Sequence, residues 1–344
     1  MTMPIPVGPE IQVNTQTIGF QFAPSVTTLA DGGWVVTWTS GGDEPDIYQQ
    51  RYDRNGGPVG GETLVNTLTS SIQSSSSVIG LADGGWVVTW HSFGGDYIGN
   101  PYSGYGICQQ RYDANGVAIG GERVVNEEGN RDQTIPSAAA LVDGGWVVTW
   151  TSADGSPLDV RLQRFDAQGA TIDGQVRVNA FGYLGRQSSA PVVSGLADGG
   201  WVVAWQTNDG WGSVYQQRYD ADGRNVGGES LVNTHWFEEQ GQPSISSLAD
   251  GGWIVVWMST QDNGSGEVYQ QRYAADGTPV GGETRVNVSY GGDQDTPSVI
   301  GRPDGGWIVT WESGWDVLQR TYDADGNAEG DEMRISASPE HPGF

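Results

Sequence analysis

Short apolar stretches with alternating side chains recur along the chain, and each follows the tripeptide Asp-Gly-Gly. In the first copy, Trp34, Val36 and Trp38 would point to one face of an extended strand, and Val35 and Thr37 to the other. Because both faces are largely apolar, we expect such strands to be covered on both sides. Gly, Asp and Asn separate the stretches, as hairpin turns require, and no sustained helical period is present. The pattern predicts an all-β protein.

The apolar stretch belongs to a repeat with six copies. Asp-Gly-Gly-Trp begins at positions 31, 83, 143, 198, 250 and 304, a Gln-Gln-Arg-Tyr block follows in four copies, and Gly-Gly-Glu-x-x-Val-Asn ends four of them. Each copy predicts four strands, which in the first copy cover 24–30, 34–38, 47–52 and 62–66. We therefore predict that residues 1–344 form a single six-bladed β-propeller domain of four-stranded antiparallel blades, with a β-solenoid as the lesser alternative.

The third block of the repeat occurs once more, in residues 8–15 at the N-terminus. A ring of six blades needs only six such strands, and the C-terminal copy around Glu332 lacks the usual Asn. We expect the N-terminal strand to close the ring, and closure by the C-terminal strand is the alternative.

The repeated large side chains have structural interpretations. Twelve of the 15 tryptophans belong to the repeat and are expected to form the core between blades. The repeated Arg of the third strand, such as Arg51, is expected to pair with the Glu of the fourth, such as Glu62, because a hairpin brings them together. Cys108 stands where other copies have Tyr, which favours a packed thiol.

Candidate ligand-binding residues lie on one predicted face. The connection between the second and third strands varies most in length, so this face, shared with the connections between blades, is where binding is expected. A Gln recurs there before the first strand, and irregular aromatic residues accompany it. The candidates are Gln21, Gln73, Gln133, Gln240, Gln294, Trp211, Trp236, Trp315, His91 and Tyr105. The alternative for the Gln residues is that they satisfy backbone groups of the loops.

The charge of the chain excludes several partners. It contains 42 acidic residues and 16 basic ones, all arginine, for a net charge of −26. Nucleic acids and anionic membrane surfaces require basic patches, so neither is expected as a partner. No apolar run approaches the ~20 residues of a membrane-spanning helix, and the first residues do not resemble a signal peptide.

No catalytic or metal-binding motif stands out. His91, His235 and His341 occupy unrelated positions of the repeat, and the strands keep their pattern in every copy, whereas an enzyme would need an asymmetric site. We therefore expect no enzyme, no catalytic residue, no cofactor and no metal site. Asp-x-Asp/Asn-Gly turns such as Asp53 to Gly56 leave calcium as a minor alternative to plain hairpin turns.

The three blocks of the repeat, read for example in residues 29–38 and 59–67, resemble tandem repeats of large bacterial secreted proteins of the RTX and VCBS type, including adhesins. The resemblance implies an extracellular or cell-surface location. With the residues above, it favours a non-enzymatic, multivalent binding module for glycans or cell-surface glycoconjugates, similar to a lectin. A structural or adhesive scaffold that docks a protein partner is the alternative.

Overall fold

A computed structural model describes residues 10–94, 104–127, 131–154, 157–180, 187–208, 210–262, 264–289 and 292–336. Every regular element in these ranges is a β-strand, and no helix there could cross a bilayer. The chain divides into two compact units. The first unit comprises Gln12–Gly195, and the second comprises Leu196–Phe344 with Met1–Ile11.

The strands follow one another at regular intervals. Those of the first unit are β1 (Phe20–Thr28), β2 (Trp34–Gly41), β3 (Asp46–Tyr52), β4 (Pro58–Leu64), β5 (Gln73–Gly80), β6 (Trp86–Phe93), β7 (Tyr105–Tyr112), β8 (Ala118–Val124), β9 (Gln133–Ala140), β10 (Trp146–Ser152), β11 (Asp159–Phe165), β12 (Thr171–Arg177) and β13 (Gln187–Gly195). Those of the second are β14 (Trp201–Asn208), β15 (Ser213–Tyr219), β16 (Asn225–Leu231), β17 (Gln240–Ser247), β18 (Trp253–Ser259), β19 (Glu267–Tyr273), β20 (Pro279–Arg285), β21 (Gln294–Gly301), β22 (Trp307–Ser313), β23 (Asp316–Tyr322) and β24 (Met333–Arg334).

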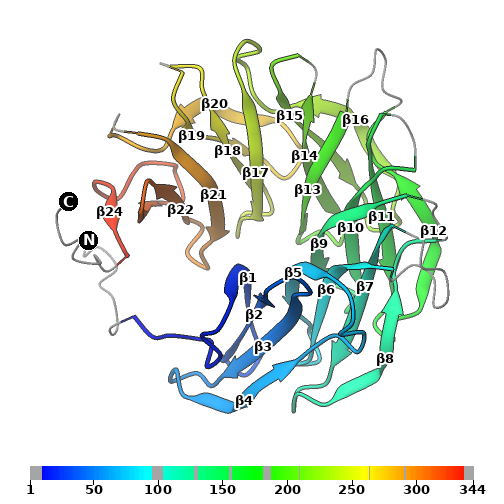
Figure 1. Cartoon of the computed structure of the whole chain (residues 1–344). Coiled ribbons are helices and arrows are strands. Elements are labelled where there is room, and N and C mark those ends of the chain that lie inside the picture. The colour runs from blue at the N-terminus through cyan, green and yellow to red at the C-terminus, as the bar shows by residue number, and fades with distance from the viewer. Residues whose placement is uncertain are drawn as a thin grey trace. The chain divides into compact units, whose positions relative to one another are not determined.

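Consecutive strands form six four-stranded antiparallel sheets, which are the blades of a six-bladed β-propeller. The predicted fold class is thereby confirmed. In the first unit, β1, β5 and β9 lie next to one another, and β4, β8 and β12 form the opposite edges of their sheets (Figure 1). In the second unit, β17 and β21 likewise contact each other.

The two glycines after Asp31 explain the invariant start of each repeat. Gly32 has a φ of +84°, which favours glycine, and a Cβ on Gly33 would lie only 2.3 Å from the carbonyl oxygen of Tyr52. The Asp31 carboxylate accepts a hydrogen bond of 2.8 Å from the Gly33 amide. The turn between first and second strands therefore packs directly on the end of the third strand.

The repeated tryptophans form the core, as predicted. Ten of them have less than 2% of their surface exposed. In four blades the first tryptophan donates its indole N–H to a glutamine of the preceding blade, as Trp86 does to Gln49 at 2.9 Å. In four blades the second donates to a glutamine of its own blade, as Trp90 does to Gln73 at 2.9 Å. Burial of the rings is thus coupled to a polar contact that fixes their position.

The expected pairing of Arg51 with Glu62 is wrong. Arg51 instead pairs with Asp31 of its own blade at 2.7 Å, and its guanidinium carbon lies 5.8 Å from the ring centre of Trp86. A bulge between third and fourth strands places Arg51 opposite Val59 rather than Glu62. The same Arg–Asp pair joins Arg111 to Asp83, Arg218 to Asp198 and Arg272 to Asp250.

The repeated glutamate connects neighbouring blades. Glu122 accepts hydrogen bonds of 2.8 Å from the backbone and the hydroxyl of Thr67, which follows the fourth strand of the preceding blade. Glu62 accepts the same two bonds from Thr15, at 2.7 and 2.9 Å. The N-terminal copy of the block therefore occupies on the first blade the place that the end of a preceding blade occupies elsewhere.

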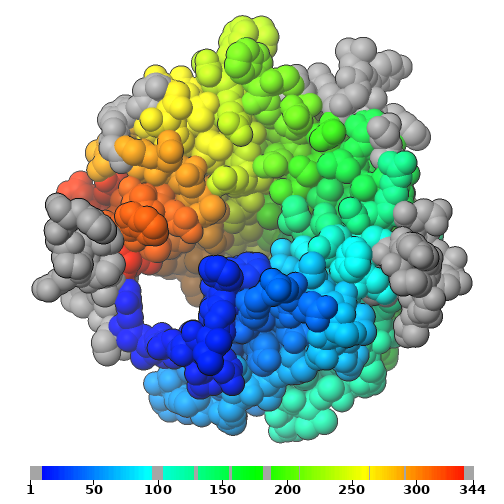
Figure 2. All heavy atoms as spheres, viewed as in Figure 1, coloured from blue at the N-terminus to red at the C-terminus, as the bar shows by residue number. Residues whose placement is uncertain are grey.

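Residues 10–18 nevertheless form no strand, whereas β24 from the C-terminal copy is the fourth strand of its sheet. This differs from the expected N-terminal strand over 8–15, of which residues 8 and 9 lie outside the described ranges. Figure 2 shows the first described residues of the first unit as an extended dark-blue arm. The arm makes no ladder of backbone hydrogen bonds as a strand would; contacts such as those of Thr15 with Glu62 fix its position instead.

The Trp–Gln contacts allow a stability test. Replacing Gln73 by Leu leaves the buried Trp90 N–H without an acceptor, which should cost about 1–3 kcal/mol of the free energy of unfolding. Urea denaturation followed by tryptophan fluorescence measures this, with Gln168→Leu in an exposed turn as the control. Equal stability of the two variants would show that the contact contributes nothing.

Candidate functional site

The connections expected to carry function do meet on one side of each unit. In the first unit, Pro45 in the β2–β3 turn accepts a hydrogen bond of 2.8 Å from Gln73 at the start of β5. In the second, Gly266 before β19 accepts one of 2.8 Å from Gln294 at the start of β21. The turn between second and third strands therefore packs on the start of the following blade. We call these turns and the connections between blades the loop face.

Four of the five candidate glutamines lie in the interior. Gln73, Gln133, Gln240 and Gln294 are at most 2% exposed, and each amide oxygen accepts an indole N–H within its own blade. They start the first strands, but their amides hold the tryptophan core. The structure therefore favours the structural alternative over a repeated polar site for ligand.

Gln21, the equivalent residue in the first blade, differs. Neither polar atom of its side chain has a hydrogen-bond partner among the described residues, and the same holds for the indole nitrogen of Trp38. The Trp–Gln contact of the second, third, fifth and sixth blades is thus not made here.

The aromatic candidates are divided between the two units. Trp211, Trp236 and Trp315 belong to the second unit and are 58%, 64% and 86% exposed. His91 and Tyr105 belong to the first unit, where their rings make an edge contact with centres 5.0 Å apart.

His91 serves the packing of two blades. Its Nδ1 accepts a hydrogen bond of 3.4 Å from the amide of Ile135, a residue of β9 with a φ of +55°. Burial lowers the pKa of His91 to about 4, against the opposing effect of Asp132. A neutral imidazole that accepts a backbone N–H fits a structural role.

In the sixth blade, a pair of carboxylates occupies the position that Ser74 and His91 occupy in the second blade. Asp295 of β21 lies directly opposite Glu312 of β22, so both side chains project from the same face of the sheet. Four other blades have different pairs at this position: Phe22 and Thr39, Ser74 and His91, Thr134 and Thr151, and Gly241 and Met258. Among these blades, only the sixth places two acids there.

Two further acids act on this pair. Burial raises the pKa of Asp295 above its usual range, and the negative charges of Asp293, Glu312 and Glu239 raise it further. We call these four residues the acid centre. Two neighbouring carboxyl groups, one of which has a raised pKa, are the arrangement that acid–base catalysis uses.

The β18–β19 turn connects the acid centre to the preceding blade. Thr260 exchanges two hydrogen bonds of 3.0 Å with Glu239, and the amide of Gly266 donates one of 3.2 Å to Asp293. A Cβ on Gly266 would lie 2.9 Å from a carboxylate oxygen of Asp295 and 3.1 Å from the carbonyl oxygen of Gln294, so the turn approaches the start of β21 closely here. The turn thus brings Glu239 and Asp295, which belong to different blades, within electrostatic range.

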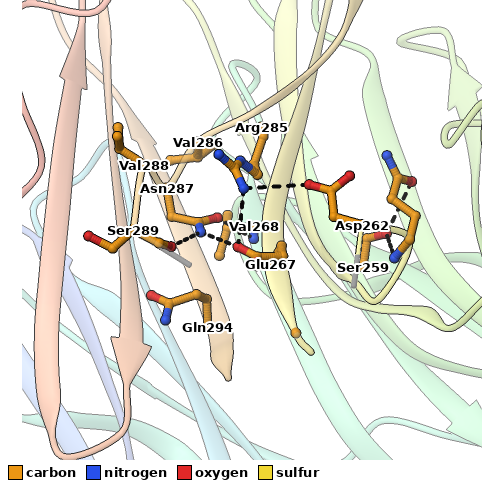
Figure 3. A network of polar contacts seen from close by, with 12 residues as sticks. Ser259, Asp262, Glu267, Val268, Arg285, Val286, Asn287, Val288, Ser289 and Gln294 are labelled. Carbon is orange, nitrogen blue, oxygen red and sulfur yellow. Dashed lines mark hydrogen bonds and ion pairs between the residues drawn. The ribbon is translucent and has the colours of Figure 1, made fainter. Parts of the chain in front are cut away.

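A buried polar network anchors this turn (Figure 3). Glu267, whose side chain is fully buried, accepts a hydrogen bond from Asn287 and lies 3.8 Å from the Arg285 guanidinium. Arg285 also lies 3.5 Å from Asp262 of the turn, and Asn287 accepts a hydrogen bond of 2.8 Å from Val268. Glu267 is inaccessible to a ligand, so the network positions the turn rather than the substrate.

The acid centre was not predicted from the sequence, although a signal existed. The strands were taken to keep their pattern in every copy. Comparing the copies at the eighth residue after the Asp of Asp-Gly-Gly-Trp finds Glu312 where His91 and Thr151 stand in other blades. Only the register shows that Asp295 is its partner.

The described residues hold no group of three or more His, Cys, Asp or Glu side chains suited to a metal ion. In the turn considered for calcium, Asp53 accepts hydrogen bonds of 2.8 and 2.9 Å from the amides of Asn55 and Gly57. This carboxylate closes its hairpin turn.

No protein-family model matches the chain, and no curated protein matches it either. Solved structures do resemble it. The NanB sialidase from Streptococcus pneumoniae aligns with a TM-score of 0.61 and 9% identity over 94% of this chain and 70% of the sialidase chain. The GH93 α-L-arabinofuranosidase of Fusarium graminearum, in complex with arabinobiose, aligns with a TM-score of 0.59 and 12% identity over 85% of this chain and 88% of the enzyme chain. A PL25 ulvan lyase bound to -[GlcA(1-4)Rha3S]- aligns with a TM-score of 0.59 and 12% identity over 91% of this chain and 81% of the lyase chain.

At identities this low, the alignments establish similarity of fold alone. The neighbours are nevertheless named as glycosidases and a polysaccharide lyase, which contradicts the expectation of a non-enzymatic binding module. That expectation depended on strands that keep their pattern throughout the ring. The Asp295–Glu312 pair breaks the pattern within two strands, so the six blades differ in their strands and not only in their loops.

The pKa of His91 predicts a pH dependence of stability. Folding lowers the pKa of His91 from 6.5 to about 4, so the unfolded chain binds the proton more tightly than the folded protein does. The free energy of unfolding therefore falls as the pH is lowered from above 6.5 towards 4. The loss is roughly 3 kcal/mol for a shift of this size. Melting temperatures between pH 4 and 7 should fall less steeply for His91→Gln than for the wild type, whereas exposed His235→Gln should follow the wild type. Parallel curves for all three proteins would contradict the assignment.

The buried network predicts a large loss of stability. Replacing Arg285 by Met leaves the Glu267 carboxylate buried without its cation, which should destabilise the fold by about 3–5 kcal/mol. Chemical denaturation measures the change, and Arg224→Met, at an arginine that is 72% exposed, is the control. A change below 1 kcal/mol at Arg285 would show that the pair does not hold the turn.

Proposed function

We propose that this protein is a carbohydrate-active enzyme that cleaves glycosidic bonds at the acid centre. The observation that carries the proposal is the pairing of Asp295, whose pKa is raised, with Glu312 on the neighbouring strand. Glycosidases in general use two carboxyl groups of this kind, one as acid and one as base or nucleophile. The fold similarity to propeller enzymes named for sialidase, arabinofuranosidase and ulvan lyase activity supports the same class of function.

The two residues take different roles. Asp295, which burial and three neighbouring negative charges keep protonated to a higher pH, donates its proton to the oxygen of the leaving sugar. Glu312, directly opposite Asp295 on the neighbouring strand, attacks the anomeric carbon as the nucleophile, because two carboxyl groups this close leave no room for a water molecule between them. The C–O bond of the glycoside breaks as a C–O bond to Glu312 forms. Asp295 then takes a proton from a water molecule, which attacks the anomeric carbon and releases Glu312, so that both carboxyl groups return to their starting states. Glu239 and Asp293 act through their charge on Asp295.

The setting proposed for this activity is extracellular or at the cell surface. The resemblance of the repeats to those of secreted bacterial proteins supports it, as does a lysine-free chain of net charge −26.

The proposal is tested by assaying a panel of oligosaccharides and polysaccharides for new reducing ends. On any substrate that is cleaved, Asp295→Asn and Glu312→Gln should each lower kcat by roughly 10²- to 10⁴-fold without lowering the melting temperature, since each removes a like-charge repulsion, whereas Asp222→Asn in an exposed turn should leave kcat unchanged. Asp293→Asn removes one like charge, so the pKa of Asp295 falls and the alkaline limb of the pH profile moves to lower pH. Cleavage that survives both Asp295→Asn and Glu312→Gln would refute this site.

A further inference from the structure

The connection between β16 and β17, residues 234–240, carries features that the catalytic pair does not use. Trp236 and Phe237 are 64% and 47% exposed, and their rings are 3.8 Å apart with an interplanar angle of 31°. The connection is held at both ends: Asn233 donates a hydrogen bond of 2.7 Å to the carbonyl of His235, and Glu239 is bonded to Thr260. A large apolar surface is thus presented to solvent by an anchored segment.

This segment also belongs to the acid centre. Glu239 is one of the three charges that raise the pKa of Asp295. Three residues of chain span at most about 10 Å, so the distance from Trp236 to Glu239 is no more than the length of about two sugar units. The aromatic pair and the catalytic pair are therefore close enough to contact the same oligosaccharide.

An unsatisfied donor lies at the base of the same segment. Gln240 is 2% exposed, and its amide oxygen accepts the indole N–H of Trp257, but its amide nitrogen has no partner among the described residues. In three other blades the equivalent nitrogen donates to the carbonyl two residues earlier: Ser71 for Gln73, Arg131 for Gln133 and Gly292 for Gln294.

The corresponding carbonyl here belongs to Glu238, which has a φ of +70°, so the backbone turns differently at this point. A buried N–H without an acceptor is costly and indicates a missing partner. A sugar hydroxyl, directly or through a shared water molecule, would supply that acceptor.

The charges around Asp295 decide what kind of sugar fits. The three groups that act on its pKa are all carboxylates, and no arginine is among them. A sugar that carries a carboxylate or a sulfate would be repelled by these carboxylates. A glycan without such groups avoids this cost and can place the C–H face of a ring on the aromatic side chains.

We propose that residues 234–240 form a subsite for a neutral glycan, with Trp236 and Phe237 as its stacking surface and Gln240 as a hydrogen-bond donor. The inference depends on the proposed function for the identity of the neighbouring catalytic pair. It separates this protein from the ulvan lyase, whose bound ligand contains glucuronate and sulfated rhamnose.

The test measures binding by calorimetry and tryptophan fluorescence, separately from cleavage. Neutral arabino-, xylo- and gluco-oligosaccharides are compared with uronate-containing, sulfated and sialylated ones, and with glucosamine oligomers. We expect the neutral series to bind, and Trp236→Ala or Phe237→Ala to weaken binding about tenfold, whereas Phe93→Ala, at an exposed ring of the first unit, leaves it unchanged.

Two variations test the electrostatic argument. Raising the ionic strength should improve the binding of anionic oligosaccharides and leave the neutral ones unaffected, because salt screens the repulsion. Glu239→Lys should likewise admit anionic oligosaccharides, since it places a cation beside Asp295, while the backbone bonds to Thr260 remain available.

The results separate the two proposals. Neutral binding through Trp236 and Phe237 with no cleavage of any glycan would support the subsite and refute the enzyme. Equal or tighter binding of anionic glycans at low salt, or a preference for glucosamine oligomers, would overturn the neutral subsite, even if cleavage depends on Asp295 and Glu312.

Discussion

The hydrogen bond between a buried tryptophan and a buried glutamine is the contact on which the rest of this structure depends. A tryptophan inside a protein contributes a large apolar surface, but its indole N–H must find an acceptor. Here Trp86 finds it in the preceding blade, at Gln49, and Trp90 in its own blade, at Gln73. One bond therefore joins blades and the other joins the strands of a blade. Because both groups are out of water, any shift of one strand would leave a donor and an acceptor unpaired.

This arrangement leaves the loop face free to differ between blades. The glutamine that begins the first strand of a blade is bonded to a core tryptophan, as Gln73 and Gln294 are. The next residue along the strand is therefore the first whose identity can differ between blades. It is Ser74 in the second blade and Asp295 in the sixth. Placing Asp295 opposite Glu312 sets two like charges side by side, which lowers the stability of the sheet. An unfavourable pair in an otherwise regular scaffold is typical of a site retained for function.

The catalytic proposal and the subsite proposal share one physical basis, the β18–β19 turn. Its contacts through Thr260 and Gly266 bring together groups from two blades, and the buried Glu267 and Arg285 hold it in position. The acid centre is thus built on anchored segments, as precise catalysis requires. The negative charges around Asp295 follow from this placement, and the subsite proposal uses them to explain which glycans would be admitted.

The sequence by itself determined the blades. Alternating Trp and Val, turn glycines at Gly32 and Gly33, and a sixfold repeat predict the propeller, because strand pattern and turn geometry are local properties. Tertiary structure decided the partners. A bulge moved Arg51 away from Glu62 and left it to Asp31, and strand register placed Asp295 beside Glu312. Such pairings depend on register and on contacts between blades, and neither can be obtained from the spacing of residues along one repeat.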